Sequence, residues 1–236
     1  GTPTFVTLRP PDYRIDWDEV RRRITPRTRA IVVNSPHNPT GMILGAEDIG
    51  ELTRVLEHTD AVVVSDEAYE HIVFDGARHE SLSRHPALAE RAVVIGSFAK
   101  TFHTTGWKVG WTAAPKALTA QVQSIHQWVT FAVNGAIQLA YAEFLRNDPE
   151  CRGVGAFYQR KRDLFLSLIE GSRFRPLPCL GTFFQMADYS AITSEGDADF
   201  AMRLLTEHGV ASIPPSSFLY AVDPGPILRF CFAKRD

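Results

Sequence analysis

The stretch Ser97-Phe98-Ala99-Lys100-Thr101-Phe102-His103-Thr104-Thr105-Gly106-Trp107-Lys108-Val109-Gly110-Trp111 directly follows an apolar run at residues 93–96. Lys100 lies three positions after Ser97, at the end of what reads as a buried strand. A lysine amine can form a Schiff base when burial or nearby cations lower its pKa, and Phe98, Phe102 and Lys108 suit such a setting. The simpler alternative is a solvated surface lysine, because most lysines are exposed.

Two polar clusters upstream have the same relation to apolar runs. Asn34-Ser35-Pro36-His37-Asn38-Pro39-Thr40-Gly41 follows residues 30–33, and Ser65-Asp66-Glu67-Ala68-Tyr69 follows residues 61–64. Ligands of parallel sheets bind beyond the carboxyl ends of the strands. The three clusters therefore predict one site built from strand ends.

Apolar runs alternate with amphipathic stretches, a pattern typical of α/β proteins. Strands are expected at residues 5–8, 31–33, 62–64, 93–95 and 111–113, with helices at 46–58 and at 16–24, the latter beginning at Asp16 as N-cap. The sequence thus predicts a three-layer α/β/α large domain with a mostly parallel sheet over residues 1–135.

In the second half of the chain, helical patterns are followed by short strand-like runs. Helical patterns at residues 115–129, 136–146 and about 151–170 precede strand-like runs at 182–187, 210–213 and 227–232 and a helix at 199–208. Residues 136–170 are expected to be linking helices, and residues 171–236 a small α+β C-terminal domain.

The composition of the chain excludes several classes of binding partner. The 236 residues are 44% hydrophobic with a formal charge of −2, so we expect neither nucleic acid nor a membrane as partner. No apolar run approaches the roughly 20 residues of a membrane span, and no signal peptide is evident. Cys151, Cys179 and Cys231 lie too far apart for a zinc motif, so we expect free thiols, no metal and a cytoplasmic location.

Four motifs in order carry a resemblance to a known family: Asn38-Pro39-Thr40-Gly41, Asp66 to Tyr69, Ser97 to Lys100, and Arg229-Phe230. With them the chain resembles the fold-type I pyridoxal-phosphate aminotransferases of class I and II. It is most similar to the branch that handles kynurenine, glutamine or methionine. The motifs span nearly the whole chain.

The resemblance implies that the protein transfers an amino group between an L-amino acid and a 2-oxo acid, through a pyridoxal 5'-phosphate aldimine on Lys100, as a homodimer. It also implies that residues 1–135 form the cofactor-binding domain without its N-terminal arm and phosphate loop, and that a last helix follows residue 236. Two alternatives stay open: a C–S β-lyase of the same family, or a non-catalytic pyridoxal-phosphate-sensing domain of a transcription regulator.

Catalytic roles are implied for Lys100, Asp66 and Tyr69. Asp66 would keep the pyridine nitrogen protonated, and its alternative is a turn or N-cap aspartate. Tyr69 and Asn38 would donate to the cofactor's phenolate oxygen, with a core aromatic and a turn residue as their alternatives. Lys100 would also move the substrate's α-proton.

The remaining roles concern anions. Ser97 and Lys108 would hold the phosphate, with Lys108 standing where many relatives have arginine. Arg229 would bind the substrate's α-carboxylate together with Asn38, and its alternative is an internal salt bridge. His37 and His103 are interpreted as packing or hydrogen-bonding residues rather than general bases.

Overall fold

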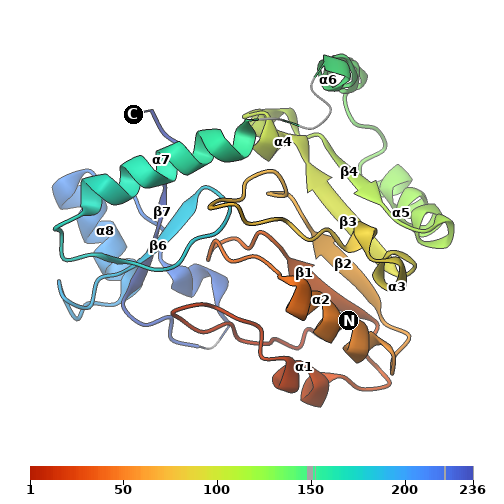
Figure 1. Cartoon of the computed structure of the whole chain (residues 1–236), viewed down its shortest axis with the longest axis horizontal. Coiled ribbons are helices and arrows are strands. Elements are labelled where there is room, and N and C mark those ends of the chain that lie inside the picture. The colour runs from red at the N-terminus through yellow and green to blue at the C-terminus, as the bar shows by residue number, and fades with distance from the viewer. Residues whose placement is uncertain (148–150, 152, 221, 236) are drawn as a thin grey trace.

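The computed structural model describes residues 1–147, 151, 153–220 and 222–235. A four-stranded sheet in the order β1-β2-β3-β4 lies at its centre (Figure 1), formed by β1 Ala30–Asn34, β2 Val62–Asp66, β3 Ala92–Ser97 and β4 Gly110–Ala113. Strands β1 to β3 are parallel and β4 is antiparallel to β3. The predicted α/β class with a mostly parallel sheet is confirmed.

The expected strand at residues 5–8 is wrong, because this segment pairs with no strand of the described chain. Its aromatic and β-branched residues suit a strand, but the side chain of Phe5 is 51% exposed and stacks on Tyr220 instead.

One face of the four-stranded sheet is closed. Val33, Val63 and Val94 point to this face and pack with Leu52 and Leu56 of helix α2, Ala46–Leu56. The same core receives side chains from η1, Leu82–Arg84, and α3, Pro86–Ala89. Helix α1, Trp17–Arg23, lies beside α2 and begins at Asp16, whose carboxylate accepts the Glu19 amide at 2.8 Å, as expected for an N-cap.

The opposite face of the sheet is open at its β1 edge. Because side chains alternate along a strand, Val32, Val64 and Val93 lie in one row on this face. Val32 is 72% exposed, whereas Val63 on the closed face is fully buried. The next positions on the open face are Asn34, Asp66, Ile95 and Ser97, so the polar strand ends follow an apolar surface.

Helices α5, Lys116–Val129, and α6, Gly135–Asn147, contribute almost nothing to the described core. No residue of α5 is buried, and Tyr141 is the buried residue of α6. No helix among the described residues is long and apolar enough to cross a bilayer.

A second, antiparallel sheet in the order β5-β6-β7 is formed by β5 Arg175–Pro176, β6 Phe184–Asp188 and β7 Ile227–Cys231. Helix α8, Asp197–His208, packs on it through Phe200, which contacts Tyr189 at 4.5 Å between ring centroids. Helix α7, Val154–Ile169, runs from the region of α4, Phe98–Thr101, toward α8 (Figure 1). The α+β character predicted for this region is confirmed, but of residues 210–213 only Ile213 forms a β-bridge, with Arg229.

Candidate active site at the strand ends

The carboxyl ends of β1 and β2 are joined by Asn34. Asn34 and Asp66 are register partners, and the Asn34 amide donates to the Asp66 carbonyl at 2.8 Å. The Asn34 Oδ1 accepts the backbone amide of Asn38 at 2.9 Å, so the same side chain also holds the following loop. Sequence reasoning gave Asn34 no role, although its place as the last residue of a predicted strand was a usable signal.

Asp66 is the last residue of β2 and is half-buried. Its Oδ1 accepts the Ala68 amide at 3.1 Å, so the turn role weighed as an alternative is present. Strand alternation also puts the carboxylate on the open face, beside Asn34. The two roles are compatible, because a carboxylate has a second oxygen.

Tyr69 lies in a buried aromatic group at the site. Its ring meets Phe183 edge-on at 5.2 Å between centroids, and its side chain is 5% exposed. Burial raises the pKa of the Tyr69 hydroxyl above its usual value, while the positive charge of Arg229 opposes this rise. The hydroxyl therefore stays protonated at neutral pH and can donate a hydrogen bond.

Lys100, in α4, is half-buried and points toward this aromatic group. Its Nζ lies 5.6 Å from the ring centroid of Tyr69 and 5.7 Å from that of Phe183. An ammonium at this distance from ring faces is attracted by them. The alternative of a solvated surface lysine does not fit this position.

Arg229 reaches the same place from β7 of the second sheet. Its Nη1 donates to Asn38 Oδ1 at 2.7 Å, a contact between residues 191 positions apart. The guanidinium carbon lies over the ring of Phe184, 4.0 Å from its centroid, and over the ring of Phe218, 4.8 Å from its centroid. Burial lowers the pKa of Arg229, and no ion pair with a carboxylate is recorded for it within the described residues. The two flanking rings escaped sequence reasoning, because nothing local in the sequence links them to Arg229.

Ser97 and Lys108 lie at the same edge of the sheet but are less closely placed. Ser97 ends β3 opposite Gly110, the first residue of β4. Lys108 lies two residues before Gly110, is exposed and has a left-handed backbone with φ 56°. The structure thus groups Asn38, Asp66, Tyr69, Lys100 and Arg229. It leaves Ser97 and Lys108 beside them, with no side-chain hydrogen bond or ion pair to a described residue.

His37 and His103 both take part in hydrogen bonds. His37 Nδ1 pairs with Thr40 Oγ1 at 2.8 Å, and burial lowers the pKa of His37 to about 4, so the ring is neutral at pH 7. His103 Nδ1 pairs with the Tyr158 hydroxyl at 2.9 Å and thereby ties the Lys100 segment to α7. These contacts agree with the structural interpretation of both rings.

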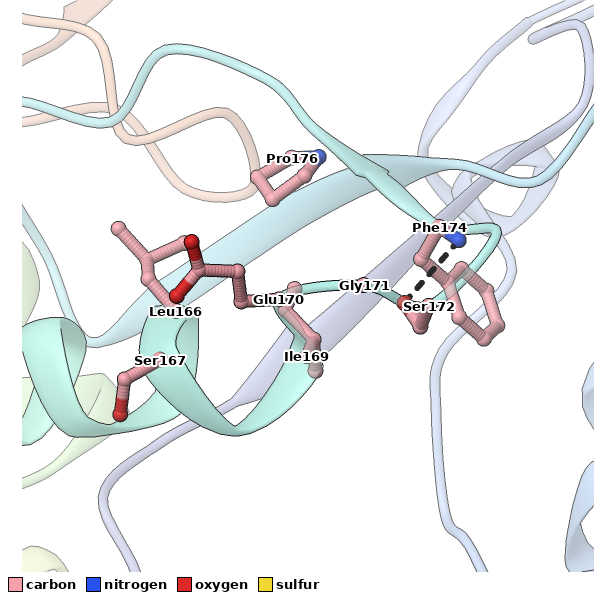
Figure 2. A pocket seen from close by; sticks show the side chains of 8 residues that line it. All are labelled: Leu166, Ser167, Ile169, Glu170, Gly171, Ser172, Phe174 and Pro176. Atoms are coloured by element: carbon pink, nitrogen blue, oxygen red, sulfur yellow. Dashed lines mark hydrogen bonds between the residues drawn. The ribbon is translucent and has the colours of Figure 1, made fainter.

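A surface hollow of about 450 Å³ lies elsewhere, at the end of α7 (Figure 2). It is lined by Leu166, Ser167, Ile169, Glu170, Gly171, Ser172, Phe174 and Pro176. None of the predicted site residues is among them, so this hollow is separate from the strand-end cluster.

Comparisons with known proteins agree with the motifs. Residues 2–236 match the family model described as aminotransferase class I and II. The chain is 42% identical to a methionine aminotransferase of Escherichia coli K12, covering all of this chain and 61% of that protein. It is 34% identical to a kynurenine–oxoglutarate transaminase of Dictyostelium discoideum, covering all of this chain and 63% of that protein.

Solved structures give the same result. The fold superposes with a TM-score of 0.95 on an Escherichia coli methionine aminotransferase that is 43% identical, over 97% of this chain and 61% of that one. It superposes with a TM-score of 0.90 on an N-succinyldiaminopimelate aminotransferase of Mycobacterium tuberculosis that is 36% identical, over 100% of this chain and 60% of that one.

The chain therefore spans about three fifths of the length of these relatives. The family match over residues 2–236 and the whole-chain similarity confirm the resemblance carried by the four motifs: the chain belongs to the class I and II aminotransferases.

Proposed function

We propose that the protein is an aminotransferase that moves an amino group between an L-amino acid and a 2-oxo acid. The observation that carries the proposal is the approach of the Lys100 amine to Tyr69, next to the hydrogen bond between Arg229 and Asn38. The family is generally dependent on pyridoxal phosphate, and we propose this cofactor here.

The polar groups of the site fit that cofactor and its substrates. Arg229 Nε is buried and has no hydrogen-bond partner within the described residues. The Tyr69 hydroxyl and Lys100 Nζ also have no hydrogen bond recorded to a described residue. Donors left in this state suit the phenolate oxygen, the aldehyde and the carboxylate that the cofactor and an amino acid would bring.

Each residue then has a chemical task. Bound pyridoxal phosphate supplies an aldehyde and an electron-withdrawing pyridine ring. Asp66 holds the proton on the ring nitrogen by its negative charge, and Tyr69 and the Asn38 amide donate to the phenolate oxygen. The Lys100 amine would hold the cofactor through its aldehyde carbon, with loss of water, and when released as a free amine it would accept the proton from the substrate Cα.

Anions are held by the remaining residues. Ser97 and Lys108 bind the phosphate through a hydroxyl donor and a positive charge. Arg229 binds the substrate's α-carboxylate, and its Phe184 and Phe218 neighbours fix the plane of the guanidinium. Asn38 completes this contact, because its Oδ1 already accepts from Arg229.

We further propose a cytoplasmic homodimer with a large domain at residues 1–135, linking helices at 136–170 and a small domain at 171–236. The two separate sheets support the division. Exposed apolar side chains on α5 and α6, such as Trp128 at 83% and Leu139 at 73%, support contact with further protein. The free thiols of Cys179 and Cys231 suit a reducing compartment.

The test is a half-reaction followed by absorbance. The cofactor-loaded protein is mixed with single amino acids, beginning with methionine and kynurenine because relatives are named for them. Aminotransfer predicts a change of the cofactor band, formation of the matching 2-oxo acid by mass spectrometry, and recovery of the band on adding a 2-oxo acid.

Two results would contradict the proposal. Release of ammonia and pyruvate from an S-alkyl cysteine, without transfer to an added 2-oxo acid, would indicate the lyase. A bound cofactor that no amino acid converts would indicate the sensing domain.

A further inference from the structure

We propose that Glu67 is a positioning residue that fixes Asp66 and Tyr69 from the closed side of the sheet; this inference rests on the proposed function. Glu67 follows Asp66 directly, and its side chain is buried at 1% exposure. Because neighbouring side chains point to opposite faces, Glu67 lies on the face where Ser65 lies, away from the Asp66 carboxylate.

The Glu67 carboxylate is held by groups from three segments. Its Oε1 accepts the Ser65 hydroxyl at 2.9 Å and the Leu82 backbone amide at 3.0 Å. Its Oε2 pairs with His79 Nε2 at 2.8 Å. Ser65 is 1% exposed, His79 8% and Leu82 0%, so these contacts are shielded from water.

The backbone of Glu67 connects its fixed side chain to Asp66 and Tyr69. The Glu67 amide donates to the Ile95 carbonyl at 2.8 Å and so extends the pairing of β2 with β3 by one residue. The Glu67 carbonyl accepts the Glu70 amide at 2.9 Å, which closes the turn that contains Tyr69. Fixing the Glu67 side chain therefore fixes the peptide that joins it to Asp66 and the turn that presents Tyr69.

The charge of the Glu67 carboxylate favours this positioning role, because an ionised carboxylate accepts stronger hydrogen bonds. Burial alone raises the pKa of Glu67, but the hydrogen bonds from His79 and the Leu82 amide outweigh it and hold the pKa below its ordinary value. The carboxylate is thus ionised at neutral pH. Arg84, whose Nη1 donates to the His79 carbonyl at 3.2 Å, braces the far side of the cluster.

The experiment separates positioning from plain stability. Glu67→Ala removes all three contacts, whereas Glu67→Gln keeps an oxygen for Ser65 and Leu82. Asp48→Ala is the matched control, because Asp48 is a half-buried carboxylate of α2 that accepts the Gly45 amide and the Trp17 indole, each at 2.9 Å, and neither partner is a site residue. All are compared with the parent as the cofactor-loaded protein and as the cofactor-free protein.

In the loaded protein, Glu67→Ala should lower kcat by on the order of 10-fold to 100-fold, with KM little changed. The midpoint of the pH titration of the cofactor's visible band should rise, because a displaced Tyr69 hydroxyl stabilises the phenolate oxygen less well. Glu67→Gln should restore most of both properties, and Asp48→Ala should leave both at parent values.

In the cofactor-free protein, Glu67→Ala should speed hydrogen exchange at residues 66–72, while Asp48→Ala should not. Hydrogen exchange needs no turnover, so it still tests the positioning role of Glu67 if the proposed function is wrong. An unchanged band midpoint and unchanged exchange in Glu67→Ala would overturn the inference. If that variant does not fold, Ser65→Ala and His79→Asn each remove one contact, and parent-like spectra and exchange in both would overturn it equally.

Discussion

The two faces of the four-stranded sheet are formed by alternate residues of the same strands, yet one face is packed and the other is open. Val33, Val63 and Val94 on one face pack under α2, whereas Val32 on the other is 72% exposed. The open face ends in Asn34, Asp66 and Ser97. The closed face therefore sets stability, and we propose that the open face, at its polar end, holds the catalytic groups.

The largest expected effect is on the open face, at Asp66. Asp66→Asn should keep the fold and much of the bound cofactor but lose on the order of 10³-fold in turnover, because a preorganised charge is removed. Turnover, cofactor stoichiometry and circular dichroism measure this. Asp16→Asn is the control, since asparagine caps a helix as well as aspartate does. A near-normal rate in Asp66→Asn would remove the chemical role from this face.

On the closed face, Leu52→Ala should have the opposite result: it should lower stability and leave turnover unchanged. Leu52 is fully buried in the α2 core, so truncation should lower the free energy of unfolding by about 2–5 kcal/mol. Urea unfolding followed by circular dichroism measures the loss, and the rate per folded molecule should stay at the parent value. A stability loss of zero would mean that α2 does not close this face.

Arg229 brings the second sheet to the open-face site. Arg229→Ala should cost about 2–4 kcal/mol in kcat/KM for amino acids and 2-oxo acids, because a charged hydrogen-bond pair is lost. Arg203→Ala is a matched control, since Arg203 also lies over an aromatic ring, Phe200, at 5.0 Å but far from the site residues in its contacts. An equal loss for amines without a carboxylate would contradict the assignment.

The smallest effect is expected at Val32. In the 236-residue chain Val32→Thr should change the free energy of unfolding by no more than about 0.5 kcal/mol, because the side chain is largely solvated. Val63→Thr buries a hydroxyl and should cost about 1–3 kcal/mol. Equal costs in chemical denaturation would contradict the exposure of Val32 on an open face.

Much of this arrangement follows from local sequence. The strand ends at Asp66 and Ser97 and the amphipathic α2 are predictable, because continuous apolar runs and helical spacing depend on neighbouring residues. The contact of Arg229 with Asn38 spans 191 positions, and that of Glu67 with His79 depends on the path of a loop, so neither has a local signal. Residues 5–8 read as a strand, but a strand also needs a partner, which propensity does not supply.

We propose that the open-face site holds its cofactor on Lys100, and borohydride reduction followed by peptide mapping tests this assignment. The loaded protein is reduced, digested and mapped by mass spectrometry. The account predicts a pyridoxyl adduct on the peptide that contains Lys100, whose Nζ lies 5.6 Å from the Tyr69 ring. An adduct on Lys108 or Lys116 instead, with Lys100 unmodified, would contradict it.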